Sequence, residues 1–318
     1  MRKETEPTSP KDHAFPLSEP LRSWRPGERT ETTQRRKVPQ RPWGGLLPLF
    51  AMLLVSLGLA QSQEFFFRDK DGTMRFSNFS SWKATRDKAN PNRFTFRGRA
   101  ATGELVGVWE KQNLTVRAKA MEGAAMKVGR QTQLEEAVMT GGVTATATRK
   151  SAKSATVPQT VVVTAERMDF KGSTNRMDLT GGVTVDQKDP AAESSMNAKS
   201  TSGYVILTDM DDKNAKGPVQ AASLQGSARI TLTSVRMVTE RPAGKPAIRR
   251  KVTYEVVATA SRVEFQLSKS GTDYGTITLV GNVVVTGNDP ILFGEMKGYQ
   301  RVVITLDAEL QPVDIEAG

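Results

Sequence analysis

Apolar and polar residues alternate along most of the chain downstream of residue 110. Arg167–Lys171 alternates strictly between charged and apolar residues, and Arg262–Ser268 and Arg301–Asp307 continue the same pattern. Successive side chains of a strand point to opposite faces, so this alternation predicts a sheet with one apolar and one polar face. No stretch of 110–318 has a convincing helical period with helix caps. The pattern predicts an all-β fold of antiparallel strands.

A glycine-containing phrase recurs between the alternating runs. It reads MTGGV at Met139–Val143, LTGGV at Leu179–Val183 and LVGNV at Leu279–Val283. A second phrase repeats upstream of the later copies, at Val163–Phe170 and Ala258–Phe265. Glycine adopts backbone angles that other residues avoid, and it lets a strand bend sharply. The repeats therefore predict a stacked sheet that folds over along a crease, with its apolar face inside.

Three loops are expected where the repeat spacing lengthens, at Arg149–Pro158, Asp186–Ser195 and Arg236–Lys251. The last is basic, and we interpret it as a solvated insertion. Thr208–Asn214 has acidic spacing loosely like that of a calcium loop, but it lacks the glycine and glutamate that such a loop requires. A hairpin turn is the better interpretation, and no metal site is predicted.

The first sixty residues predict a leader and an export segment. Residues 1–43 are polar and rich in Pro, Arg, Glu and Thr, which is typical of disorder. Residues 44–60 are uncharged and follow a basic cluster, so they predict one apolar export helix. This helix is either a signal peptide cleaved after Ala60 or an uncleaved anchor in the inner membrane. Both interpretations place the remainder of the chain outside the cytoplasm.

Residues 61–110 are predicted to form an aromatic-rich N-terminal cap ahead of the β domain at 111–318. Two strands, Glu64–Arg68 and Thr73–Phe79, are expected around a Lys70–Gly72 turn. We interpret the aromatic residues as a cover for the first strands of the sheet. A docking patch for a membrane partner is the alternative.

Composition excludes several kinds of chemistry. The chain has no cysteine and a single histidine, His13, which lies in the leader. A thiol nucleophile is therefore excluded, and a histidine-dependent active site is not expected in the folded part. No cofactor is predicted. The formal charge of +11 suits anionic partners, but aromatic residues are not interleaved with the basic ones as nucleic-acid binding requires.

The repeat consists of an alternating strand, the phrase Leu-Thr-Gly-Gly/Asn-Val and a second strand. This pattern resembles the OstA-like family, which includes the periplasmic lipopolysaccharide-transport proteins of the LptA and LptC type. The resemblance covers residues 110–318, and Val161–Asp186 and Tyr254–Leu306 carry it most clearly. It implies a β-jellyroll that is open along one side and holds the acyl chains of lipopolysaccharide in an apolar groove. It also implies joining to other jellyroll proteins through edge strands, which makes an envelope transport bridge.

We therefore expect a non-catalytic lipid-transport protein without a metal or cofactor. A ligand-free structural β-solenoid, serving as an envelope or filament scaffold, is the main alternative, and a β-helical enzyme is a third. The residues predicted to line the groove share the apolar parity of the strands, and they are Met168, Phe170, Met177, Leu179, Val183, Val185, Val263, Phe265, Ile277, Leu279, Val283, Val285, Val302 and Ile304.

Overall fold

The described part of the chain is almost entirely β-strand. The computed structural model describes residues 63–69, 72–100, 102–110, 113–151, 153–154, 156–208, 219–241, 243, 245–268, 273–292 and 294–318. Within these ranges no helix is long and apolar enough to span a membrane. The predicted leader at 1–43 and export helix at 44–60 lie outside the described residues, as do Lys70, Asp71 and most of the acidic loop at Thr208–Asn214.

Fifteen strands and one short 3-10 turn make up the described part of the chain. In chain order the elements are β1 (Gln63–Asp69), β2 (Gly72–Arg86), β3 (Arg93–Ala100), β4 (Leu105–Trp109), β5 (Leu114–Ala118), β6 (Ala120–Val128), β7 (Gln131–Lys150), β8 (Pro158–Lys171), η1 (Gly172–Thr174), β9 (Arg176–Asp189), β10 (Ser194–Leu207), β11 (Val219–Glu240), β12 (Ile248–Leu267), β13 (Gly275–Gly287), β14 (Met296–Leu306) and β15 (Pro312–Ala317).

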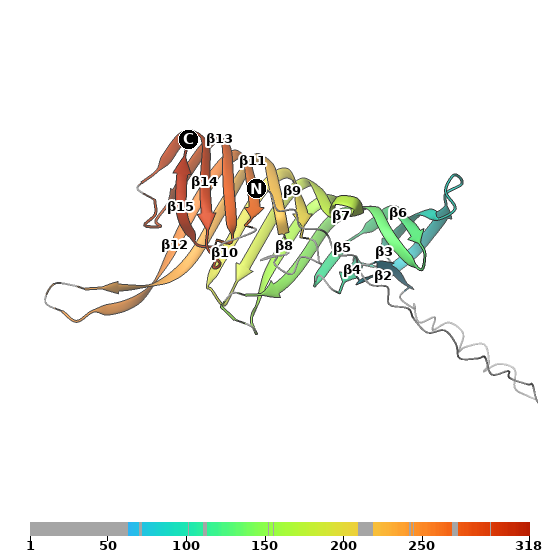
Figure 1. The fold of residues 1–318 in the computed structure, drawn as a ribbon, viewed down its shortest axis with the longest axis horizontal. Helices are drawn as coiled ribbons and strands as arrows, with labels where there is room; N and C mark the ends of the chain where they lie inside the picture. Colours follow the sequence, from blue (N-terminus) through green and yellow to red (C-terminus); the bar gives the residue numbers. More distant parts are fainter. Residues whose placement is uncertain are drawn as a thin grey trace, which may run out of the picture. The chain divides into compact units, whose positions relative to one another are not determined.

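All of these strands belong to one antiparallel sheet, which confirms the all-β prediction. From β7 to β15 each strand pairs with the next one in sequence, so the strands lie side by side in chain order (Figure 1). The two predicted N-terminal strands are confirmed as β1 and β2, which pair with each other. The described part of the 61–110 segment thus continues the sheet.

From β7 to β13, every second strand carries a pair of left-handed residues near its middle. The pairs are Gly141–Gly142 in β7, Gly181–Gly182 in β9, Gly226–Ser227 in β11 and Gly281–Asn282 in β13. The register with a neighbouring strand shifts at each pair, as between Thr164 and Arg167 of β8 opposite β9. These are bulges that bend the strand. The predicted crease is therefore present, and Gly226, which the sequence also places among the recurring glycines, supplies the copy in β11.

Steric contact explains why the first residue of each pair is glycine. A Cβ atom built on Gly181 would lie 2.5 Å from Cβ of Glu166 in β8, and one on Gly141 would lie 2.8 Å from Cβ of Lys119. Both distances are shorter than real Cβ contacts. The second position is different, because a Cβ on Gly182 would meet no atom within 4 Å. This position tolerates asparagine and serine, as Asn282 (φ 50°) and Ser227 (φ 53°) show.

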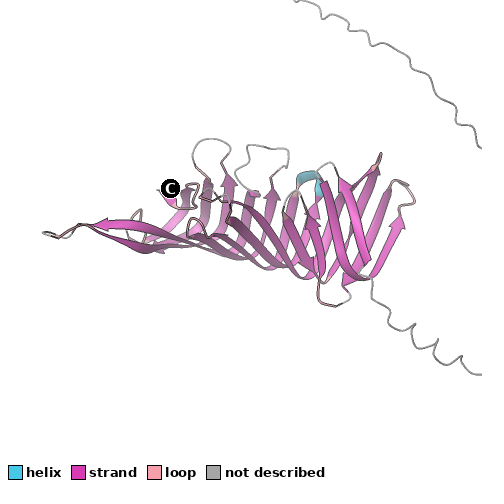
Figure 2. Cartoon of the chain, turned by 90° about the horizontal axis from the view of Figure 1, so that it is seen from below, coloured by secondary structure: helices cyan, strands magenta, loops and turns pink. Residues whose placement is uncertain are grey.

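The crease divides the sheet into two layers that share one core. Layer A contains β3, β6, β15, the β7 segment before the crease and the segments of β8–β14 aligned with it. Layer B contains β4, β5, the β7 segment after the crease and the remaining segments of β8–β14. Trp109 of β4 meets Phe170 of β8 across the interior, with ring centroids 5.2 Å apart. Figure 2 shows that strands form nearly all of the described chain. The two layers therefore cover each other's apolar faces.

At its N-terminal end the sheet closes on itself. β7 pairs with β6 through its first half and with β5 through its second half. The path continues from β5 through β4, β2 and β3 back to β6. β2 turns between the layers at Asn78 (φ 68°), whose Nδ2 donates hydrogen bonds to the carbonyl oxygens of Thr102 and Glu104 at 3.0 and 2.6 Å. At the opposite end, β15 pairs with β14 alone among the described strands.

Two of the predicted loops are shorter than expected. Asp186–Ser195 was expected to be a loop, but β9 continues to Asp189 and β10 begins at Ser194. Arg236–Lys251 is largely a paired extension of β11 and β12, which projects beyond the neighbouring strands (Figure 1). Both segments contain polar residues that alternate as in a strand. Such residues do not prevent main-chain pairing, so the strands continue through them. The loop after Arg149 is real, since β7 ends at Lys150 and β8 begins at Pro158.

The crease gives a matched pair of substitutions. We expect Gly181→Ala to destabilise the protein by about 2–3 kcal/mol, because a left-handed backbone and a clash with Glu166 act together. Gly182→Asn should cost less than about 1 kcal/mol, since open space surrounds it. Urea denaturation of both variants measures the difference. Equal losses of unfolding free energy would contradict the steric account of the crease.

Candidate functional site

The fourteen residues predicted to line an apolar groove all face the shared interior. Twelve of them are buried in the core, and Val185 and Phe265 are partly buried against it. Cross-strand register brings many of them into contact, as in the pairs Met168–Leu179 and Phe265–Ile277. The parity argument therefore located inner-face residues correctly. Whether lipid contacts them stays a prediction.

Sequence reasoning missed much of the same inner face. β10 and β11 contribute buried Met196, Val205, Leu224, Ile230 and Leu232. Their alternation is present in the sequence but is diluted by serine, threonine and glycine on the outer face. The N-terminal strands add a further set around the closed end, namely Met74, Phe76, Phe79, Phe96, Leu105 and Leu114. The interior thus runs along all the strands from β2 to β14.

The interior is closely packed, with small apolar cavities between the layers. The larger cavity has a volume of about 40 Å³, and Val161, Val185 and Met196 of layer B face Leu224 and Phe265 of layer A across it. A cavity of this size holds about one water-sized group. A second, of about 20 Å³, lies near Phe76, Trp109 and Phe170 at the closed end. An acyl chain enters only if the layers separate or side chains change rotamer.

A row of buried polar residues borders the apolar interior in layer B. This polar rim consists of Arg149, Gln159, Asp189, Ser194 and Ser234, which all occupy the inward parity at one height of the sheet. Arg149 lies opposite Gln159, and Ser194 lies opposite both Asp189 and Ser234. Four of the five are buried, and Arg149 is half-buried. The next row toward the crease is mainly apolar and includes Val161, Met196 and Leu232.

The polar rim faces the start of β13, which belongs to layer A. The guanidinium of Arg149 lies 4.8 Å from the ring centroid of Tyr274, and its Nε donates a hydrogen bond to Oε1 of Gln159. Asp189 accepts a hydrogen bond from Ser151 Oγ at 2.8 Å, and its other oxygen accepts from the backbone N–H groups of Ala191 and Ala192. Polar contacts therefore join the layers on the side opposite the crease.

Burial shifts the pKa values of Tyr274 and Arg149, which meet where the polar rim faces the start of β13. Desolvation raises the pKa of Tyr274 above its ordinary value, and the adjacent Arg149 charge opposes part of that rise. Desolvation lowers the pKa of Arg149, against the attraction of Tyr274 and Asp189. Nearby, Lys153 Nζ contacts Glu309 Oε1 at 2.8 Å, which links the β7–β8 loop to the β14–β15 turn. The Arg149–Tyr274 contact and the Lys153–Glu309 contact both bridge the two layers.

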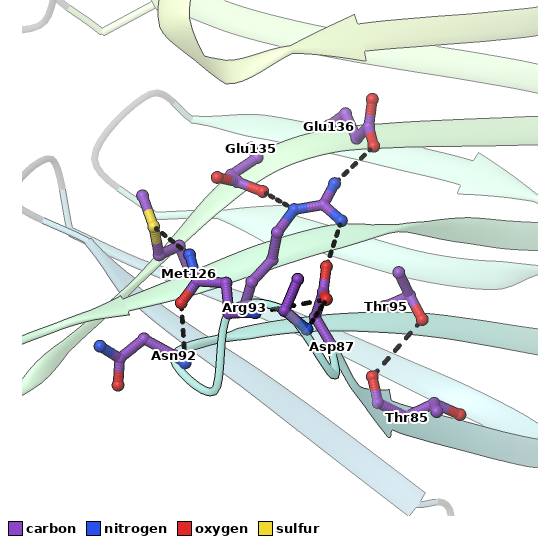
Figure 3. Close-up of polar contacts among 10 residues, drawn as sticks. Thr85, Asp87, Asn92, Arg93, Thr95, Met126, Glu135 and Glu136 are labelled. Carbon is purple, nitrogen blue, oxygen red and sulfur yellow. Dashed lines mark hydrogen bonds and ion pairs between the residues drawn. The ribbon is translucent and has the colours of Figure 1, made fainter.

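The polar clusters on the outer face are either fully paired or open to solvent. Arg93 contacts Glu135, Glu136 and Asp87 at 2.7, 3.2 and 3.4 Å (Figure 3). The hydrogen bond to Glu135 is the main cause of the raised pKa of Arg93. This cluster ties β3 and the β2–β3 turn to β7 and stabilises the closed end. A polar hollow of about 470 Å³ lies over β2, β3, β6 and β7 and is lined partly by Arg97 and Arg99.

No family model matches the chain, and neither a curated protein nor a solved structure matches it. The interior and its polar rim are therefore interpreted from their geometry and chemistry. The described residues include no group of three or more His, Cys, Asp and Glu side chains placed to hold a metal ion.

Tyr274 gives a pH-dependent test of the junction between the layers. Its pKa is raised by folding, so its contribution to stability is present below its ordinary pKa of 10.0 and is lost as pH rises through the folded value. We expect Tyr274→Phe to lose less unfolding free energy than the wild type between about pH 9 and about pH 11. Urea denaturation at both pH values measures this, and absorbance titration should show one late tyrosine ionisation missing. Equal losses in the two proteins would contradict the burial of this hydroxyl.

Proposed function

We propose that this protein is a non-catalytic carrier of lipid acyl chains, a periplasmic OstA-like β-jellyroll that transports lipopolysaccharide or a related lipid. The observation that carries the proposal is the continuous apolar interior between two layers of one folded sheet, bordered by a buried polar rim. An amphiphilic lipid likewise has an apolar part and a polar part. Its acyl chain prefers the apolar interior, and its headgroup prefers the polar side.

The energetic case rests on the hydrophobic effect. Transferring an acyl chain out of water gains about 0.8 kcal/mol per methylene, or roughly 9 kcal/mol for about eleven methylenes. That gain offsets the cost of separating two layers whose polar junction has few contacts. The layers share their main chain at the crease, so they open on the opposite side. Two contacts must break or rearrange there, one between Arg149 and Tyr274 and one between Lys153 and Glu309.

The ends of the sheet support a role in a bridge. The outer edge of β15 is unpaired among the described strands, and such an edge accepts a further strand from a partner. The ring through β2–β7 closes the other end. We propose that another jellyroll protein pairs at the β15 edge, and that the export segment at 44–60 delivers the chain to the periplasm or holds it at the inner membrane. We propose no nucleic-acid partner.

A ligand-free structural scaffold is the second candidate. The observation that favours it is the small size of the interior cavities, about 40 and 20 Å³. Close packing of this kind is expected of a sheet that serves only as a rigid element. The two functions differ in whether lipid ever replaces the contacts between the layers.

Photo-crosslinking in cells separates the two functions. We expect crosslinkers at Phe170 and Val283, which face the interior, to capture lipopolysaccharide or a related lipid. Matched crosslinkers at the adjacent residues Asp169 and Asn282, on the outer parity, should capture far less. Mass spectrometry of the adduct and of lipid that copurifies with the chain identifies the lipid. Labelling only from the outer positions, or no labelling at all, would favour the scaffold.

A further inference from the structure

Two hydrogen-bond donors beside the larger cavity lack an acceptor. Nη1 of Arg149 and Nε2 of Gln159 are buried and make no hydrogen bond. The Gln159 side chain is only 1% exposed, and the adjacent Gln187 side chain hydrogen-bonds Tyr274. An unpaired buried donor costs about 1–3 kcal/mol, so native structures rarely retain two of them together. Such a cluster indicates a place where another molecule supplies oxygen atoms.

The unpaired donors lie at the polar end of an apolar cavity. Gln187 and Tyr274 line the cavity itself, together with Val161, Val185 and Phe265. Arg149 stacks on Tyr274, and its neighbour Gln159 lies two residues before Val161 on the same face of β8. The Oε1 atom of Gln159 already accepts from Arg149 Nε, which directs its Nε2 donor elsewhere. An acyl chain in the cavity therefore ends beside these donors.

The unpaired guanidinium donor of Arg149 favours an oxyanion headgroup. Asp189 is the nearby buried carboxylate, and its oxygens accept hydrogen bonds from Ser151, Ala191 and Ala192. It balances the charge of Arg149 but leaves Nη1 without an acceptor. Guanidinium groups bind carboxylate and phosphate through paired N–H donors, and desolvation strengthens that contact. A neutral hydroxyl supplies fewer acceptor sites and no charge.

We infer that the polar rim around Arg149 is a headgroup site that binds the carboxylate or phosphate of an acyl lipid. Arg149 and Gln159 donate to the oxyanion, while the chain lies between the layers next to Phe265 and Val185. Gln187 and Tyr274 form the boundary between the two zones. The inference rests on the proposed lipid-carrier function and adds the chemical class of headgroup that the interior selects.

Binding measurements on the purified full chain test this site. The probes are laurate, dodecyl phosphate and dodecanol, each titrated below its micelle or solubility limit against a bound fluorescent fatty acid. We expect the wild type to bind the two anionic probes at least about tenfold more tightly than dodecanol. The ratio of laurate to dodecyl phosphate distinguishes a carboxylate site from a phosphate site. Equal affinity for all three probes would overturn the headgroup site.

Substitutions assign the preference to individual residues. Arg149→Met should weaken laurate and dodecyl phosphate binding at least about tenfold and leave dodecanol unchanged, because the methionine retains an apolar stem. Arg176→Met is the matched control, since Arg176 stacks on Tyr204 at 3.9 Å and pairs with Asp178 outside this site. Unchanged anion affinity in Arg149→Met would contradict the inference.

Two further outcomes distinguish a failure of the headgroup site from a failure of the proposed lipid-carrier function. If none of the three probes binds the wild type, the lipid-carrier function itself fails. If dodecanol binds as tightly as the anions, the carrier function stands and the headgroup site is wrong. Should Arg149→Met not fold, Gln159→Leu removes one of the donors, and the anion preference of the wild type still decides the result without any variant.

Discussion

The close approach of glycine to the neighbouring strand is the contact on which the rest of the structure depends. A one-sided apolar sheet must cover its apolar face, and here the sheet covers itself by bending at the same height in each strand. The bend requires left-handed backbone angles at a point where a Cβ would overlap the adjacent strand, as at Gly181 against Glu166. Only glycine meets both conditions. The two layers, the core and the polar rim all follow from that bend.

Folding the sheet over gives its two sides different chemical roles. On the crease side the layers are joined covalently, and their separation is limited. On the opposite side they meet through side chains, where Arg149 stacks on Tyr274 and Lys153 pairs with Glu309. These contacts are few and partly polar, so they cost less to break than the apolar core does. The proposed entry of lipid would therefore open the polar rim and leave the crease intact.

The sequence allowed the strand class, the crease and the inner face to be predicted because each depends on local properties. Alternation placed Met168, Leu179 and Ile277 on the inner face, and the structure buries all three completely. The polar rim was not predicted, since Gln159 and Asp189 look like surface residues when only their type is considered. Their parity was the available signal. The projecting β11–β12 hairpin was missed because its basic residues resemble a loop.

By itself, the sequence determined that this chain forms a one-faced antiparallel sheet that bends at repeated glycines, because side-chain parity and backbone angles are properties of neighbouring residues. Only the tertiary structure decided that the N-terminal strands close the sheet and that Tyr274 meets Arg149. Arg149 and Tyr274 lie more than a hundred positions apart in the chain, and the closing pairs β3–β6 and β5–β7 skip over intervening strands. Their pairing depends on how far the layers twist and on which strand ends meet, and no local pattern encodes that.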